Sequence, residues 1–231
     1  MPKKSEIISF FVFKKLDFSV FCGIINTISY KRTVDAATHR RAFKYFCCEV
    51  CDVKKAASIF LRADITLRDV DRMIRWMENP NVTRFLNEDA DIVYFLRQLS
   101  DSVPEPMLGY HFRRVGHFFM VCPEHEGSVG FVRLSPLRDP GAYEIVYVIG
   151  EEALWGRGLG EGAIRAALSE AFLTLDIQTL VAKIMPKNRR SVRSVTACGF
   201  TQSSLSDGLL HYTITQDAYF QQLRALSQQR A

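Results

Sequence analysis

The sequence predicts an α+β domain over about residues 56–220, and two observations lead to that fold class. Runs of apolar and β-branched residues, which favour strands, alternate with stretches whose apolar residues recur every three or four positions, as on one face of a helix. The predicted order is strand, two helices, three strands, helix, strand, helix and strand. A chain of 231 residues has enough apolar residues to give such a domain a full core.

The first predicted strand and two helices occupy residues 59–99. Residues 59–65 have the composition of a strand, and Thr66 and Asp69 then resemble the capping box of a helix. This helix is expected to stop near Asn79-Pro80, and its apolar stripe consists of Val70, Met73, Ile74 and Met77. A second helix, about Ala90–Leu99, places on one face Ile92, Phe95, Leu96 and Leu99.

Three predicted strands and a long helix follow. The strands His117–Val121 and Ser128–Leu134 are expected to pair in antiparallel fashion around a turn at Pro123–Gly127. The third strand is Ala142–Ile149, which leads into a glycine-rich segment. After that segment, helical spacing resumes in a continuous stripe of Ala163, Ile164, Ala167, Leu168, Ala171, Phe172 and Leu175.

The last predicted elements complete the domain. Thr179–Pro186 has the pattern of a strand ended by proline. Asn188 is suited to cap a short helix at residues 189–197, and Leu209–Thr215 is expected to be the strand that closes the sheet. We therefore expect an N-terminal extension at 1–55, the domain at 56–220 and a C-terminal tail at 221–231.

The glycine-rich segment Trp155–Gly162, with the sequence WGRGLGEG, is the most informative part of the chain. Glycines let backbone N–H groups turn toward a phosphate, and the N-terminus of the following helix adds partial positive charge, so this unit can hold an anion. The segment lacks the Lys-Ser/Thr pair of a P-loop. It also lacks the glycine spacing and the acidic partner of a dinucleotide-binding loop, which disfavours a nucleotide-binding protein.

The segment resembles instead the acetyl-CoA loop of the GNAT acetyltransferase superfamily, written [QR]-x-x-G-x-[GA]. Gly158 and Gly160 match the two small positions, and Trp155 stands where the pattern has Gln or Arg. That departure, as Trp-Gly-[KR]-Gly, is similar to the Rim-type branch, which includes ribosomal-protein and spermidine acetyltransferases. The stretch from Leu67 to Val82 also resembles the start of a Rim-type domain.

A second segment resembles the same superfamily in order and spacing. A strand is followed by Asn188-Arg189-Arg190-Ser191, which matches Asn-x-x-Ser, then by a short helix and by Gly199-Phe200. The resemblance covers roughly 70% of the chain. It implies the GNAT fold, a mixed and mostly antiparallel twisted sheet flanked by helices.

The resemblance also implies acetyl-CoA as co-substrate, and no metal is expected. The residues that would bind it are Val148, Ile149, Trp155, Gly156, Arg157, Gly158, Leu159, Gly160, Glu161, Asn188 and Arg193. Asn188 could contact the pantetheine arm, cap its helix, or do both. The arginines of that helix, Arg189, Arg190 and Arg193, either meet the adenosine phosphates or form a solvated basic face.

Three residues are candidates for catalysis. Glu144 lies in an otherwise apolar strand, where it either relays a proton from the acceptor amine or orients it, or forms an ion pair with Arg133 or Arg138. By the same resemblance, Ser191 would protonate the departing thiolate, although serines in a first helical turn are often solvated. Tyr147 could share that role or simply pack in the sheet.

These candidates predict an acetyl-CoA-dependent N-acetyltransferase that works by direct attack in a ternary complex. No Ser or Cys nucleophile stands in a recognisable motif, which argues against a covalent acyl-enzyme. Backbone N–H groups of Val148–Gly150 are expected to meet the oxyanion. The acceptor would be a small-molecule amine or a protein N-terminal amine. The alternative is a GNAT-fold module that binds acyl-CoA or a protein partner without turnover.

Charge and cysteine content bound the remaining alternatives. Residues 1–55 hold eleven Lys or Arg against five Asp or Glu, whereas the whole chain has a net charge of +5. The remaining 176 residues are therefore nearly neutral, and no nucleic-acid partner is expected. The apolar runs Ile7–Phe13 and Phe18–Ile25 are short and are separated by charges, which makes membrane association unlikely. Cysteine usage favours a reduced, cytoplasmic protein. The protein is expected to be a monomer or a homodimer. A zinc site is a weaker alternative, and it would use Cys48, Cys51, Cys122 and His125.

Overall fold

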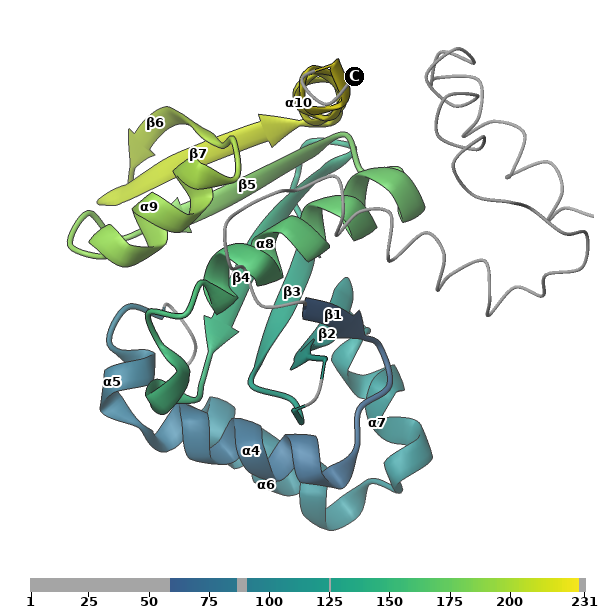
Figure 1. The fold of residues 1–231 in the computed structure, drawn as a ribbon. Helices are drawn as coiled ribbons and strands as arrows, with labels where there is room; N and C mark the ends of the chain where they lie inside the picture. Colours follow the sequence, from purple (N-terminus) through teal and green to yellow (C-terminus); the bar gives the residue numbers. More distant parts are fainter. Residues whose placement is uncertain (1–58, 87–90, 125, 229–231) are drawn as a thin grey trace, which may run out of the picture. The chain divides into compact units, whose positions relative to one another are not determined.

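A computed structural model describes residues 59–86, 91–124 and 126–228 of the chain (Figure 1). The expectations for the N-terminal extension, including its two apolar runs, lie outside these ranges. So do Cys48, Cys51 and His125, and the zinc alternative stays untested. Among the described residues, no helix is both long and apolar enough to cross a membrane.

The described chain forms one seven-stranded sheet in the order β1-β2-β3-β4-β5-β7-β6, with helices on both faces. The strands are β1 (Ile59–Arg62), β2 (His117–Pro123), β3 (Gly130–Pro136), β4 (Ala142–Ile149), β5 (Thr179–Ile184), β6 (Thr201–Ser206) and β7 (Leu209–Thr215). The helices are α4 (Leu67–Glu78), α5 (Pro80–Thr83), α6 (Ile92–Ser102), α7 (Glu105–Phe112), α8 (Leu159–Ser169), α9 (Arg189–Ala197) and α10 (Gln216–Gln228). A 3₁₀ turn η1 (Glu152–Leu154) precedes α8, and a π-helical turn η2 (Glu170–Thr174) extends it.

Every strand pair is antiparallel except β4 and β5, which run parallel. These two strands pair over three residues only, Ala142–Glu144 against Thr179–Val181. Beyond Glu144, β4 stays bonded to β3 but leaves β5, so a gap opens in the middle of the sheet. The mixed, mostly antiparallel sheet confirms the predicted fold class.

Two hydrophobic cores lie on opposite faces of the sheet. One packs α8, α9 and α10 against Val121, Leu134 and Ile145 of the sheet. The other packs α4 and α6 against Met120, Phe131 and Val148. The sheet residues alternate between the two cores because successive side chains of a strand point to opposite faces.

A buried polar network fixes the start of α4. Thr66 caps the helix and completes the predicted capping box with Asp69, which is 2% exposed. The Asp69 carboxylate accepts hydrogen bonds from the Ser128 hydroxyl (2.6 Å), the Thr66 hydroxyl (2.7 Å) and the Thr66 N–H (2.8 Å). The Arg62 guanidinium donates to both of its oxygens at 2.9 Å. This carboxylate therefore ties β1, α4 and the start of β3 together.

The structure departs from the predicted order at several places. β7 does not close the sheet, because β6 pairs outside it and forms the edge. Helices α5, α7 and α10 were not predicted, and α10 runs across the expected boundary at residue 220. Phe95 is 46% exposed, so it does not share the buried face of α6 with Leu96 and Leu99.

Candidate active site

The gap between β4 and β5 brings the predicted site residues together from both faces of the sheet. Glu144 is the last residue of β4 that pairs with β5. By strand alternation its side chain lies on the face of Val148, which packs in the core of α4 and α6. Tyr147 lies on the other face and packs against the core of α8 and α9. A group held in the gap could therefore meet a carboxylate on one side and a phenol on the other.

The glycine-rich segment forms an open turn at the N-terminus of α8. Gly156 and Gly158 have φ angles of +81° and +79°, which L side chains adopt only with strain. Gly158 is the N-cap of α8 and the helix has no side-chain cap, so the first N–H groups of α8 are left for an external acceptor. A methyl group at Gly156 would meet nothing within 4 Å, which shows that the turn faces open space.

Two tryptophans hold the end of β4 beneath this turn. The Trp155 indole donates to the carbonyl of Ile149 (2.7 Å). Trp76 of α4 packs directly on Gly150, where an added Cβ would lie 2.1 Å from its ring, and donates to the Glu151 carboxylate (3.1 Å). Trp76 was not predicted as part of this region, because its contacts come from a helix about 75 residues away.

The backbone groups that face the gap differ from those predicted. The Gly150 N–H donates to the carbonyl of Val129 (2.9 Å), in the segment leading into β3, so it points away from the gap. Alternation along the strand gives the Val148 N–H the same direction. The amide groups of Tyr147 and Ile149 then point toward the open side. Of the predicted oxyanion contacts, only Ile149 has its N–H on the correct side.

A pair of hydroxyls spans the gap on the α8 and α9 face. The Tyr147 hydroxyl and the Ser191 hydroxyl lie 2.7 Å apart. Burial raises the pKa of Tyr147 to about 12, although hydrogen bonds from Ser191 and Ser194 act in the opposite direction. The phenol is therefore protonated throughout the physiological range. Asn188 caps α9 by accepting from the Ser191 N–H (3.1 Å), which confirms the predicted cap and fixes Ser191 in the first turn.

Glu144 forms an ion pair with Lys183 of β5, with 2.6 Å between the carboxylate and the ammonium group. The predicted partners, Arg133 and Arg138, were wrong. The reason is the short parallel pairing of β4 with β5, which aligns Glu144 with Val181 and places Lys183 two residues further along the same face. Both side chains stay partly exposed, at 25% for Glu144 and 31% for Lys183.

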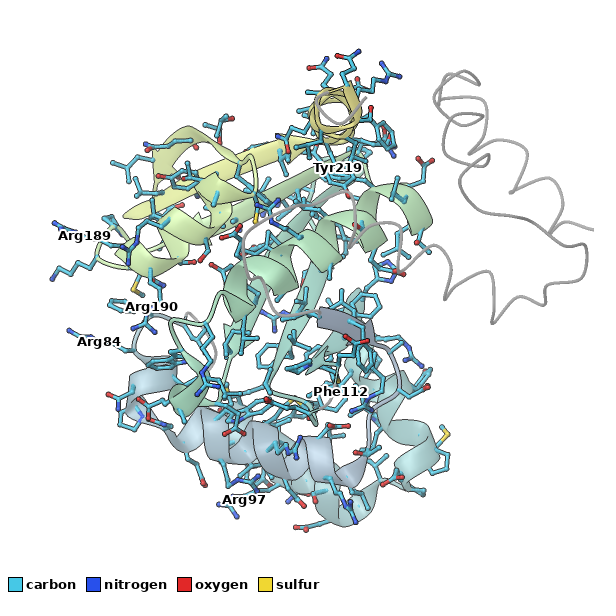
Figure 2. The ribbon with its side chains drawn as sticks, viewed as in Figure 1. Arg84, Arg97, Phe112, Arg189, Arg190 and Tyr219 are labelled. Carbon is cyan, nitrogen blue, oxygen red and sulfur yellow. The ribbon has the colours of Figure 1, made fainter. Side chains whose placement is uncertain are left out.

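Arg189 and Arg190, at the start of α9, point in different directions (Figure 2). Arg190 stacks on Trp155, with 4.5 Å from the guanidinium carbon to the ring centroid. Arg189 and Arg193 instead line an outer cleft of about 490 Å³ with Pro186, Val192 and Leu210. Arg193, which was predicted to bind the co-substrate, is one of the residues that line this cleft. It stays a prediction with no supporting contact.

The other predicted loop residues contribute backbone more than side chain. The Leu159 side chain is buried in the core, and the Glu161 carboxylate pairs with Arg165 at 2.7 Å. Arg157 is exposed. An added Cβ at Gly160 would lie 3.5 Å from the Tyr147 ring and 3.8 Å from the Ser194 hydroxyl, so the turn adjoins both β4 and α9.

Comparison with known proteins gives consistent results. A family model described as an acetyltransferase (GNAT) domain matches residues 59–201. An uncharacterized N-acetyltransferase, p20 of Bacillus licheniformis, is 24% identical over 140 residues, which cover 60% of this chain and 77% of that protein.

Two solved structures have a similar fold. The spermidine N-acetyltransferase of Vibrio cholerae, in complex with CoA and spermine, has a TM-score of 0.57 at 18% identity and covers 70% of this chain and 98% of its own. The aminoglycoside acetyltransferase AAC(6')-Ib, in complex with coenzyme A, has a TM-score of 0.57 at 15% identity and covers 71% and 98%.

Proposed function

The chain belongs to the GNAT acetyltransferase family and is an acetyl-CoA-dependent N-acetyltransferase, and from that premise we propose that it acetylates a small primary amine by direct attack. The observation that carries the proposal is the gap between β4 and β5. One side of it holds the open turn of α8 and the Tyr147–Ser191 hydroxyl pair. The other side holds the Glu144 carboxylate. Membership of the Rim-type branch remains a prediction.

Each residue then has one task. Acetyl-CoA supplies a thioester as acyl donor and a thiol as leaving group. The N–H groups at the start of α8 bind its pyrophosphate, and the Ile149 N–H faces the carbonyl oxygen on which negative charge develops. Glu144 orients the acceptor amine and takes its proton, because an amine with a pKa of about 10 is mostly protonated at neutral pH.

The hydroxyl pair is placed to supply a proton to the leaving sulfur. Ser191 Oγ is the group that donates, and Tyr147 replaces the lost proton through their 2.7 Å hydrogen bond. Solvent returns a proton to the phenol after the products leave. The raised pKa of Tyr147, caused chiefly by burial, keeps the phenol in the donating form. Direct attack by the amine requires donor and acceptor to be bound together, with the acceptor entering from the face of Glu144.

The acceptor class is supported by the solved relatives. Both are named for the acetylation of small amines, spermidine in one case and aminoglycosides in the other. This favours a small-molecule amine over a protein N-terminus. We also propose that the predicted residues 56–220, together with the rest of α10, form the catalytic domain, because every residue with a task above lies within them and α10 packs against the same core.

Replacing Gly160 tests the co-substrate assignment. Because an added Cβ there meets only ordinary contacts and the φ angle is not left-handed, the fold should tolerate a side chain. Gly160→Asp places a carboxylate beside the phosphate position, so we expect the affinity for acetyl-CoA to fall at least tenfold, about 1.4 kcal/mol. Titration calorimetry on the full-length protein measures this loss.

Gly160→Asn is the matched control, since it adds nearly the same bulk without the charge. We expect it to bind acetyl-CoA more tightly than Gly160→Asp does. If a folded Gly160→Asp variant bound acetyl-CoA with unchanged affinity, the turn would not be the site that binds the pyrophosphate. Equal losses in both variants would show that bulk, and not charge, is responsible.

Ser191→Ala tests the proton donor. Turnover with a good amine acceptor should fall by about tenfold or more, while acetyl-CoA affinity stays within about twofold, because the serine acts on the leaving group and not on binding. Tyr147→Phe keeps the ring and removes the hydroxyl, so it should show a smaller loss in the same direction. Wild-type turnover in both variants would exclude this hydroxyl pair from catalysis.

A further inference from the structure

A cation–π contact between Arg190 and Trp155 connects the first turn of α9 with the segment that leads into α8. Trp155 immediately precedes the glycine-rich turn, and Arg190 belongs to the first turn of α9. The guanidinium carbon lies 4.5 Å from the indole centroid. Trp155 is itself fixed by its 2.7 Å hydrogen bond to the Ile149 carbonyl, so it is a firm platform for the cation.

Stacking uses the face of a guanidinium and leaves its edge available. The five N–H donors of arginine lie in the plane of the group, which suits the oxygens of a phosphate. Within the described part of the chain, no carboxylate lies within ion-pair distance of Arg190. The stack therefore holds a cation in place while its donors stay accessible.

The position of Arg190 relative to the turn follows from its neighbours. The Ser194 hydroxyl donates to the Arg190 carbonyl one turn along α9 (3.2 Å), and the same hydroxyl lies 3.8 Å from the Cβ position of Gly160. Arg190 thus stands on the side of α9 that faces the start of α8. Figure 2 shows Arg190 extending from α9 toward the part of the molecule that carries α5, while Arg189 points outward.

We propose that Trp155 and Arg190 form a preorganised phosphate-binding pair: Arg190 binds the pyrophosphate held by the turn, and Trp155 is the positioning residue that orients it. The proposal rests on the proposed function, because it assigns a specificity element of the same co-substrate site. The pair makes the protein select thioesters that carry a pyrophosphate over simple pantetheine thioesters. Of the three α9 arginines that the sequence analysis considered for the adenosine phosphates, this proposal assigns the pyrophosphate to Arg190.

Binding of three ligands to the full-length protein tests the pair. Calorimetry would use CoA, 3'-dephospho-CoA and pantetheine with wild type, Arg190→Gln and Arg189→Gln. We expect Arg190→Gln to weaken CoA and dephospho-CoA by the same factor, about tenfold or more, and to leave pantetheine unchanged. Arg189→Gln is the matched control, since it removes the same charge from the neighbouring residue and should change none of the three.

The role of Trp155 is tested by a double-mutant cycle on CoA binding. Trp155→Leu removes the aromatic ring on which Arg190 stacks. It should weaken CoA binding severalfold in the wild-type background, but it should cause little further loss of CoA affinity in the Arg190→Gln background. Trp155→Phe, which keeps an aromatic face, should recover part of the loss. Pantetheine binding serves as the structural readout, because general damage to the gap would weaken it as well.

The outcomes separate cleanly. No CoA binding by wild type would contradict the proposed function itself. If the wild type binds CoA but Arg190→Gln and Arg189→Gln weaken that binding equally, or not at all, the role of the Trp155–Arg190 pair is overturned and the proposed function stands. A loss confined to CoA and absent for dephospho-CoA would assign Arg190 to the 3'-phosphate and overturn the pyrophosphate contact. Additive effects of Trp155→Leu and Arg190→Gln would overturn the positioning role of Trp155.

Discussion

Glu144→Gln should lower turnover at least a hundredfold at pH 6, with a smaller loss at pH 9. The glutamine keeps the shape of the side chain but cannot take a proton. Proton transfer by a positioned group is typically worth about 10²–10⁴-fold in rate. The loss is largest at low pH because less of the amine, whose pKa is about 10, is then deprotonated without help. Steady-state rates of thiol release across pH 6–9, with saturating acetyl-CoA, measure the effect.

Lys183→Gln is the control for Glu144, because it breaks the same ion pair and leaves the carboxylate in place. If Glu144 serves only to tie β4 to β5 through that pair, both variants should lose the same activity. We expect Lys183→Gln to keep turnover within about fivefold of wild type, since exposed or partly exposed pairs contribute little to stability. Wild-type rates in Glu144→Gln across the whole pH range would exclude this residue from proton transfer.

Asp69→Asn should reduce the free energy of unfolding by about 3 kcal/mol, because it leaves the Arg62 charge and several donors without their buried acceptor. Asp69 receives five hydrogen bonds from three residues and is 2% exposed. Denaturant unfolding of both proteins at pH 7 measures the difference. Glu78→Gln is the control: its ion pair with Arg97 is exposed, and we expect a change within about 0.5 kcal/mol.

The effect of Asp69 should also depend on pH. Burial acts to raise the pKa of this carboxyl, but hydrogen bonds from Ser128, Thr66 and Arg62 outweigh it and hold the pKa below its ordinary value of 3.8. A carboxyl whose pKa is lower in the folded state stabilises the fold above pH 3.8, and this contribution is lost as pH falls through the lowered pKa. The difference between wild type and Asp69→Asn should therefore narrow below pH 4. A constant difference down to pH 2 would contradict this account.

The elements predicted most closely were those with strong local signals. The strand Ala142–Ile149 and the helix at 189–197 were found with their predicted bounds, because one is a continuous β-favouring run and the other begins at an asparagine cap. The polar strand Thr201–Ser206 has no apolar alternation and is exposed throughout, so only its pairing with β7 reveals it. Helix α7 contains Pro106 and Gly109, which weaken a helical pattern.

The site was predictable in its residue types but not in its pairings. The glycine-rich turn and Ser191 belong to short sequence motifs, so they could be named from the sequence. The hydrogen bond between Tyr147 and Ser191 joins residues 44 positions apart, and the ion pair of Glu144 with Lys183 depends on the register of two parallel strands. The direction of the Gly150 N–H likewise follows from its bond to Val129. Predicting such contacts requires knowledge of which strands are neighbours and in which register they pair.

The central claim is direct transfer of an acetyl group from acetyl-CoA to an amine. The most direct measurement incubates the full-length protein with acetyl-CoA carrying a labelled acetyl group, with and without a panel of polyamines, aminoglycosides and amino-terminal peptides. Free thiol, labelled acceptor and labelled protein are quantified together. We predict that thiol release requires an amine, matches labelled small-molecule amine one to one, and leaves no label on the protein when the amine is omitted. Label bound to the protein in the absence of an acceptor, or no thiol release with any amine, would contradict the account.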